Sequence, residues 1–151
     1  MKYVMTHELS EKMKKEIEEI YPQVFGSFNK EKFYDRFNFH KKFLLIMAYK
    51  NNLPVAFKFG YALDSDLFYS WTGGVIPSER RQGIAEELMR RQHKWCIENK
   101  YQFIETRSRN RFPEMIALNI KWGFKITGTF TETDGAPKII FRKDLDLVPG
   151  L

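Results

Sequence analysis

The spacing of apolar residues predicts two helices near the start of the chain. Within residues 9–21, apolar side chains recur at steps of four, four and three residues among charged ones, which is the period of an amphipathic helix. Thr6 or Ser10 is placed to cap its start, and Pro22 is expected to end it. A second, shorter helix is predicted over residues 29–37, with Asn29 as its cap.

Three apolar runs follow, and each is short enough to be a strand. They span residues 43–49, 54–63 and 67–75, and turn-forming residues separate them at Asn51-Asn52 and at residues 64–66. Strands joined by such short turns favour an antiparallel meander.

The second half of the chain alternates between helical and strand patterns. Residues 83–99 carry the most regular amphipathic helix. The strand at 101–106 follows this helix, so it should lie parallel to the strand at 67–75. A helix over 113–122, ended by Gly123, precedes the last two strands at 124–131 and 138–141. These elements predict one α+β domain over residues 1–151 with a mixed sheet.

Composition narrows the class of protein. Hydrophobic residues make up 43% of the 151 residues and charged residues 29%, which is typical of a globular domain. No apolar run is long enough for a bilayer span, and the first residues lack a secretory pattern, so we expect a cytoplasmic protein without a membrane segment. Cys96 is the one cysteine, which excludes an intrachain disulfide, and the three histidines show no ligand spacing, so no metal site is expected.

The formal net charge of +6 leaves a nucleic-acid partner to consider. The basic residues are spread along the chain, and we find neither an arginine-rich recognition helix nor a strand motif that mixes basic and aromatic residues. We therefore expect no nucleic acid. A phosphate-bearing small molecule needs only a local cluster of positive charge.

The segment from Val75 to Leu88 offers such a cluster. It is predicted to be a strand end, a short loop with Arg80 and Arg81, and the first turn of a long helix after Gly83. The first amides of a helix lack internal partners and carry partial positive charge, so they attract phosphate. From the residues alone, an ordinary strand–loop–helix connection with surface arginines remains the alternative.

Residues 80–85, Arg-Arg-Gln-Gly-Ile-Ala, resemble the GNAT acetyltransferase signature Gln/Arg-x-x-Gly-x-Gly/Ala. Val75-Ile76-Pro77 resembles the Val-x-Pro that precedes it in that superfamily, and residues 118–124 resemble its Leu-Tyr-x-Lys-x-Gly-Phe segment. The resemblance implies a GNAT-type acyl-CoA N-acyltransferase fold. Such a fold has a mixed central sheet, an antiparallel meander, splayed parallel central strands and helices on both faces.

The resemblance also implies acetyl-CoA as the cosubstrate. Amides of the signature loop would hold its pyrophosphate, the strand end would pair with its pantetheine arm, and amides of residues 72–75 would polarise the acetyl carbonyl. Gly73-Gly74 would suit a bulge there or simply mark a bend. The cofactor-binding residues predicted in this way are Val75, Arg80, Arg81, Gln82, Gly83, Ile84, Ala85, Glu86 and Asn110.

Two residues are predicted to take part in catalysis. Glu105 is the candidate base, although pairing with a nearby arginine or facing solvent is the alternative. Asn119 occupies the position of the family's tyrosine acid and would support the leaving thiolate by a hydrogen bond, or else satisfy polar groups at the helix end. Tyr69, Trp71, Phe28 and Tyr34 are predicted to bind the acceptor, with core packing as the alternative for the last two.

The predicted activity is transfer of an acetyl group to a primary amine of a small molecule or peptide. The alternative is a catalytically degenerate protein of the same fold that binds an acyl-CoA and acts as a sensor or interaction module, because the tyrosine is missing. Homodimers are common in the superfamily, and the assembly state is left open.

Overall fold

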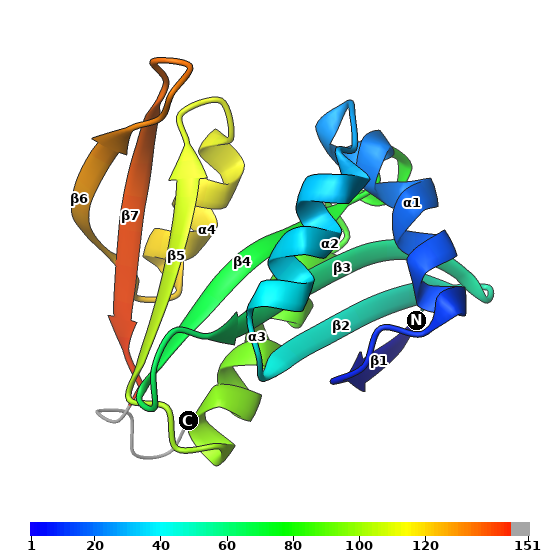
Figure 1. The fold of residues 1–151 in the computed structure, drawn as a ribbon, viewed down its shortest axis with the longest axis horizontal. Coiled ribbons are helices and arrows are strands. Elements are labelled where there is room, and N and C mark those ends of the chain that lie inside the picture. Colours follow the sequence, from blue (N-terminus) through cyan, green and yellow to red (C-terminus); the bar gives the residue numbers. More distant parts are fainter. Residues whose placement is uncertain (146–151) are drawn as a thin grey trace. The chain divides into compact units, whose positions relative to one another are not determined.

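The computed structural model describes residues 1–145, which form an α+β arrangement of four α-helices and seven β-strands (Figure 1). The strands follow the order β1-β2-β3-β4-β5-β7-β6, and β4 and β5 are parallel, so the predicted mixed sheet is confirmed. The elements are β1 (Lys2–Thr6), α1 (Glu11–Phe25), α2 (Lys30–Phe39), β2 (Phe43–Lys50), β3 (Leu53–Ala62), β4 (Leu67–Val75), the 3-10 helix η1 (Pro77–Glu79), α3 (Ile84–Glu98), β5 (Phe103–Arg109), α4 (Pro113–Lys121), β6 (Lys125–Thr131) and β7 (Pro137–Asp144).

The chain divides into two compact units, and the division passes through β4 and α3. The first unit contains Met1–Ala62 and Thr72–Gln92. The second unit contains Leu63–Trp71 and the chain from His93 onward. Each unit has its own buried apolar residues, so each is described by itself.

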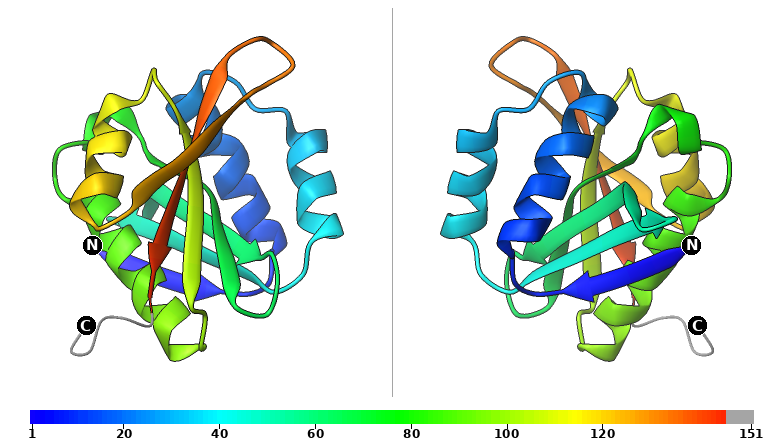
Figure 2. Two further views of the ribbon diagram at one scale, coloured as in Figure 1. Left: turned by 90° about the vertical axis from the view of Figure 1, so that its left-hand side faces the viewer. Right: turned by 90° about the vertical axis from the view of Figure 1, so that its right-hand side faces the viewer.

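The first unit is built on the antiparallel strands β1, β2 and β3. Helices α1 and α2 cover one face of β2 and β3, and the first part of α3 lies on the other face (Figures 1 and 2). Ile17 and Ile20 of α1 and Phe57 and Phe59 of β3 are fully buried. Burial of the apolar face of α1 against these strands is the main stabilisation that a helix of this length needs.

The second unit contains the parallel pair of strands. The first residues of β4 pair with β5, with Tyr69 opposite Glu105, and β7 lies antiparallel between β5 and β6. Phe68, Ile104 and Phe141 are fully buried, one from each of β4, β5 and β7. The parallel pairing that we predicted from the intervening helix is confirmed.

The prediction that Pro22 ends the first helix is wrong. The helix α1 continues to Phe25 and ends at Gly26, which has φ 83° and donates its N–H to the carbonyl of Pro22 at 2.8 Å. A proline so near the end removes only its own N–H bond, and three more residues complete the last turn. Ser10, not Thr6, caps the start and accepts from the N–H of Met13.

Three further differences concern strands. The strand β1 was not predicted, because five residues at a sheet edge give little periodicity. β5 begins and ends later than the predicted 101–106, and β7 extends beyond the predicted 138–141 at both ends, because the two strands pair with each other over seven residues. The cap of α2 by Asn29 is confirmed, with its side chain accepting from the N–H of Lys32.

Candidate functional site

The loop between β4 and α3 lies in the first unit and is fixed to two strands. The N–H of Ile76 donates to the carbonyl of Val55 on β3 at 2.9 Å. Glu79 of η1 forms an ion pair with Lys50 at the end of β2, with a Nζ–Oε2 distance of 3.1 Å. These two contacts hold the loop in one conformation, which a binding site for a small anion requires.

Two residues of this loop adopt the left-handed backbone conformation. Gly83 has φ 80°, which favours glycine, and Arg81 has φ 63°, which costs a side chain about 1 kcal/mol or more. Together they turn the chain from η1 into α3. Arg80 precedes them and donates from Nε to the carbonyl oxygen of Val75 at 3.0 Å. Its guanidinium keeps further N–H donors beyond the one used there.

Gly83 caps the start of α3 without a side chain. Its carbonyl accepts the N–H of Glu87 at 3.0 Å, so the helical bonds begin here. The amides of Ile84 and Ala85 therefore have no acceptor within the helix. A Cβ built on Gly83 would meet nothing within 4 Å. The start of α3 thus fits a phosphate group, which would receive backbone N–H donors and the positive end of the helix dipole.

The end of β4 is packed closely on both of its faces. A Cβ built on Gly73 would lie 3.0 Å from the carbonyl oxygen of Phe57 and 3.3 Å from Cγ of Lys58. A Cβ built on Gly74 would overlap Cγ1 of Val24 on α1. Two glycines are needed here because two neighbouring elements approach the backbone of β4, which the sequence alone did not indicate. The predicted bulge at these residues stays a prediction.

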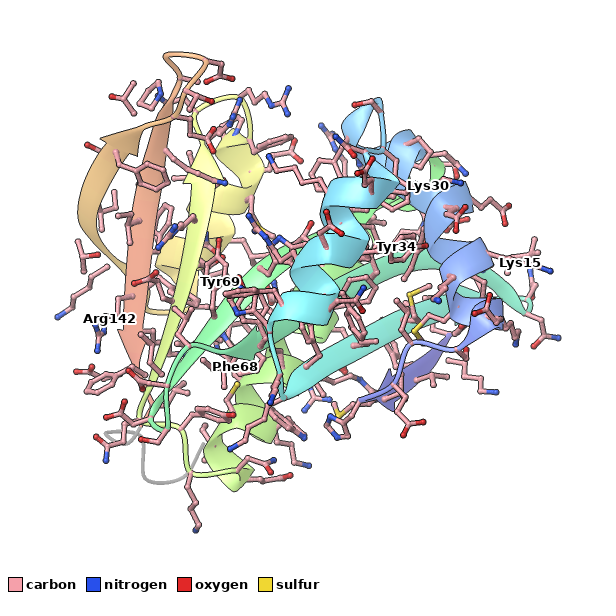
Figure 3. The ribbon with its side chains drawn as sticks, viewed as in Figure 1. Lys15, Lys30, Tyr34, Phe68, Tyr69 and Arg142 are labelled. Carbon is pink, nitrogen blue, oxygen red and sulfur yellow. The ribbon has the colours of Figure 1, made fainter. Side chains whose placement is uncertain are left out.

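Phe28 and Tyr34, predicted to bind the acceptor, lie beside α1 in the first unit. The hydroxyl of Tyr34 donates to Oε2 of Glu18 at 2.9 Å, and Nζ of Lys30 lies 3.4 Å from Oε1 of the same carboxylate (Figure 3). Burial, and then the hydrogen bond to Glu18, raises the pKa of Tyr34. The ring of Phe28 lies 4.5 Å from that of Tyr21, centroid to centroid. Both predicted residues are half-buried, and their role in binding stays a prediction.

Tyr21 was not predicted as a site residue, yet it connects α1 to β4. Its side chain lies near that of Thr72, and burial raises its pKa. Its ring stacks on Phe57 with a centroid distance of 5.5 Å. The amphipathic pattern placed Tyr21 at the end of a helix, but nothing in the sequence pairs it with Thr72, which is 51 residues further along the chain.

The predicted base lies in the second unit, where it contacts an arginine. Oε2 of Glu105 is 3.1 Å from Nη2 of Arg107, and the Glu105 side chain is 14% exposed. The guanidinium of Arg107 also lies over the rings of Tyr69 and Phe130, 5.2 Å from each centroid. The alternative that Glu105 pairs with a nearby arginine is therefore what the structure shows, and that arginine, Arg107, also contacts Tyr69. Residues two apart on a strand share a face, and that spacing is the signal that identifies Arg107.

The other residues predicted in the second unit are more scattered. Asn119 of α4 is buried, and its backbone carbonyl accepts the N–H of Phe124 at 3.0 Å. Asn110 is exposed in the turn between β5 and α4, and Trp71 is half-buried on β4. Their proposed roles stay predictions.

Within residues 1–145, no group of three or more His, Cys, Asp or Glu side chains is placed to hold a metal ion. No helix in the described part of the chain has the length and apolarity to cross a membrane.

Comparison with known proteins identifies the family. The model of the acetyltransferase (GNAT) family matches residues 10–118. The chain belongs to the GNAT acetyltransferase family. The family and the fold predicted from the resemblance are thereby confirmed. No curated protein sequence matches the chain.

Solved GNAT structures are similar over nearly the whole chain. The ribosomal-protein-S18-alanine N-acetyltransferase of Escherichia coli has a TM-score of 0.81 at 17% identity, covering 99% of this chain and 97% of that one. An aminoglycoside 6'-N-acetyltransferase complexed with coenzyme A has a TM-score of 0.78 at 13% identity, with 99% of each chain covered. A GNAT acetyltransferase from Elizabethkingia anophelis with acetyl-CoA bound has a TM-score of 0.73 at 16% identity, covering 95% and 98%. At these identities the similarity shows the fold.

Proposed function

We propose that this protein transfers the acetyl group of acetyl-CoA to a primary amine. The observation that carries the proposal is the start of α3, where Gly83 caps the helix without a side chain and leaves open space beside it. Membership in the GNAT family supports the same activity. Structures of two proteins with this fold contain coenzyme A or acetyl-CoA, which supports the choice of donor.

The backbone from Arg81 to Glu86 would hold the pyrophosphate of the donor. The amides of Ile84 and Ala85 supply N–H donors, and the guanidinium of Arg80, anchored on Val75, adds positive charge beside them. When bound, acetyl-CoA supplies a thioester whose thiolate leaves readily, because a thiol has a pKa near ~8.5.

The reaction forms the C–N bond of an amide and breaks the C–S bond of the thioester. An amine that arrives as an ammonium must lose a proton before it attacks. The nitrogen releases a second proton to solvent as the amide forms, and the thiolate leaves as an anion that takes up a proton from solvent. In this proposal Glu105 accepts the proton, directly or through water, and Asn119 donates a hydrogen bond toward the sulfur. Amides within residues 72–75 stabilise the negative charge on the carbonyl oxygen.

The acceptor is proposed only as a class. Two of the three similar acetyltransferases named above act on a ribosomal protein and on aminoglycosides, so the fold alone does not choose between peptide and small-molecule amines. Half-buried rings of Tyr21, Phe25 and Phe28 pack together beside β4 in the first unit, which favours an amine attached to an apolar or aromatic group.

The experiment that tests the donor site is thermal unfolding with acetyl-CoA, CoA, ATP or no ligand. A ligand bound by the native state at about a hundred times its dissociation constant should add about 2.7 kcal/mol to the free energy of unfolding. Gly83→Glu should abolish the response, because a carboxylate then lies at the start of α3. Gly135→Glu is the matched control, since Gly135 also has a left-handed backbone and open space around a built Cβ.

A rise in midpoint with acetyl-CoA and CoA, kept in Gly135→Glu and lost in Gly83→Glu, supports the donor site. The absence of a rise with either CoA ligand rejects the proposal. Asparagine at the usual tyrosine position, Asn119, keeps a second candidate open, a GNAT protein that binds acyl-CoA without turnover. Release of free CoA thiol that depends on added amine separates the enzyme from this sensor.

A further inference from the structure

The last turn of α1 lies directly on the end of β4. Thr72 and Gly74 are two residues apart on the strand, so they face the same side. Tyr21 and Val24 are three residues apart on the helix, so they also share a side. Tyr21 lies near Thr72, and Val24 occupies the space where a Cβ of Gly74 would lie.

This contact is held rigidly. Gly26 ends α1 with its N–H on the carbonyl of Pro22 at 2.8 Å, which fixes the backbone around Val24. The ring of Tyr21 is packed against Phe25 at 4.8 Å and against Phe57 at 5.5 Å. Side chains held in this way cannot move aside without breaking several ring contacts, so they form a wall rather than a flexible cover.

The wall and the phosphate-binding loop lie on opposite faces of the first unit. Figures 1 and 2 show α1 and α2 on one face of β2 and β3 and the start of α3 on the other. A donor whose phosphates rest on α3 would therefore present its acyl end at residues 72–74 from the α3 side. An acyl chain that extends beyond the carbonyl would then run toward Val24 and Tyr21.

We infer that Val24, supported by Tyr21, restricts the donor to short acyl groups and excludes longer ones such as butyryl. The inference rests on the proposed function, because it assumes an acyl-CoA bound with its carbonyl at the end of β4. Val24 sets the depth available to the acyl chain, and the glycine at position 74 allows Val24 to approach so closely.

Calorimetric titration with CoA, acetyl-CoA, propionyl-CoA and butyryl-CoA tests this without knowledge of the acceptor. Wild-type protein should bind butyryl-CoA at least about tenfold more weakly than acetyl-CoA, since a chain too long for a rigid pocket loses on the order of 10- to 200-fold. Val24→Ala should bring the two affinities to within about threefold, and Val24→Ile should also weaken propionyl-CoA. Val4→Ala is the matched control, a half-buried valine of β1 in the same unit, and should keep the wild-type order.

The outcomes distinguish the two proposals. If no CoA ligand binds, the donor site itself is rejected. If CoA and acetyl-CoA bind but wild-type protein binds butyryl-CoA equally well, the donor site stands and the role of Val24 is rejected. If wild-type protein discriminates against butyryl-CoA and Val24→Ala discriminates equally well, the role of Val24 is also rejected. Val24→Ile keeps a branched apolar side chain, so its effect on propionyl-CoA tests the same role if Val24→Ala folds poorly.

Discussion

Arg80 donates a hydrogen bond from Nε to the carbonyl oxygen of Val75 at 3.0 Å, joining the two ends of the loop that precedes α3. A charged residue in the signature loop of a GNAT protein is readily assigned to phosphate binding alone. Here the same guanidinium also determines the shape of the loop, because it spans from the residue after η1 back to the last residue of β4.

Arg80→Ala should therefore weaken CoA binding by about tenfold, because both the loop shape and one positive charge are lost. Because Arg80 is exposed, the free energy of unfolding should fall by only about 1 kcal/mol. Calorimetric titration with CoA and urea unfolding measure the two effects. Arg90→Ala is the control, since Arg90 pairs with Glu87 further along α3 and should leave the CoA affinity unchanged. Equal CoA affinities of the Arg80 variant and the wild type would show that Arg80 contributes nothing to the site.

Glu105 provides a test of the proposed base. Glu105→Gln should lower the whole pH profile of kcat by about 10²- to 10⁴-fold. The glutamine oxygen still accepts from Arg107, so the free energy of unfolding should change by less than about 1 kcal/mol. Glu98→Gln, an exposed carboxylate of α3 in the same unit, should leave the profile unaltered. A rate that Glu105→Gln leaves unchanged across pH would remove Glu105 as the base.

The pattern of neighbouring residues in the sequence was sufficient to predict most helices and strands of the first unit. Of the four apolar positions that defined the helical period, Met13, Ile17 and Ile20 are buried on α1, whereas Leu9 precedes the helix and is half-buried. Gly83 was predicted to start α3 from a short motif, and both its backbone conformation and the helix start confirm this. In each case, the information is contained within a few neighbouring residues.

Contacts between distant segments could not be predicted in this way. Val24 lies against Gly74, and Tyr21 lies near Thr72, only because α1 packs over the end of β4. The alignment of one element over another depends on the packing of every side chain between them. For the same reason, the edge strand β1 was missed, since its pairing with β2 rather than its own pattern defines it.

Tyr34 and Glu18 should make stability depend on pH in the acid range. The hydrogen bond from Tyr34 is the largest of the effects that lower the pKa of the Glu18 carboxyl. A lowered folded-state pKa contributes stability above the unfolded value of ~4.3, and this contribution is lost as pH falls through the folded value. Tyr34→Phe should therefore lower the unfolding midpoint at pH 6, and the difference from wild type should shrink toward pH 3.

Lys30→Met is the comparison for that experiment. Lys30 also lowers the pKa of Glu18, by a hydrogen bond and by its charge, so Lys30→Met should show a pH-dependent loss of the same sign. Thermal unfolding of wild type, Tyr34→Phe and Lys30→Met in matched buffers between pH 3 and pH 7 measures these differences in unfolding midpoint. A difference between wild type and Tyr34→Phe that stays constant over this range would contradict the assignment.

The ionisation of Lys143 should make the free energy of unfolding depend on pH in the alkaline range. Its Nζ lies 3.4 Å from Nδ1 of His93, and burial lowers the pKa of the ammonium group. Between the lowered folded value and the unfolded value of ~10.4, the unfolded chain binds more protons, so the free energy of unfolding should rise with pH. Lys143→Met should lack this rise between pH 8 and pH 10, whereas Lys125→Met, an exposed lysine of β6, should keep the wild-type slope. Urea unfolding at each pH measures the slopes, and parallel profiles for wild type and Lys143→Met would show that Lys143 titrates alike in the folded and unfolded chain.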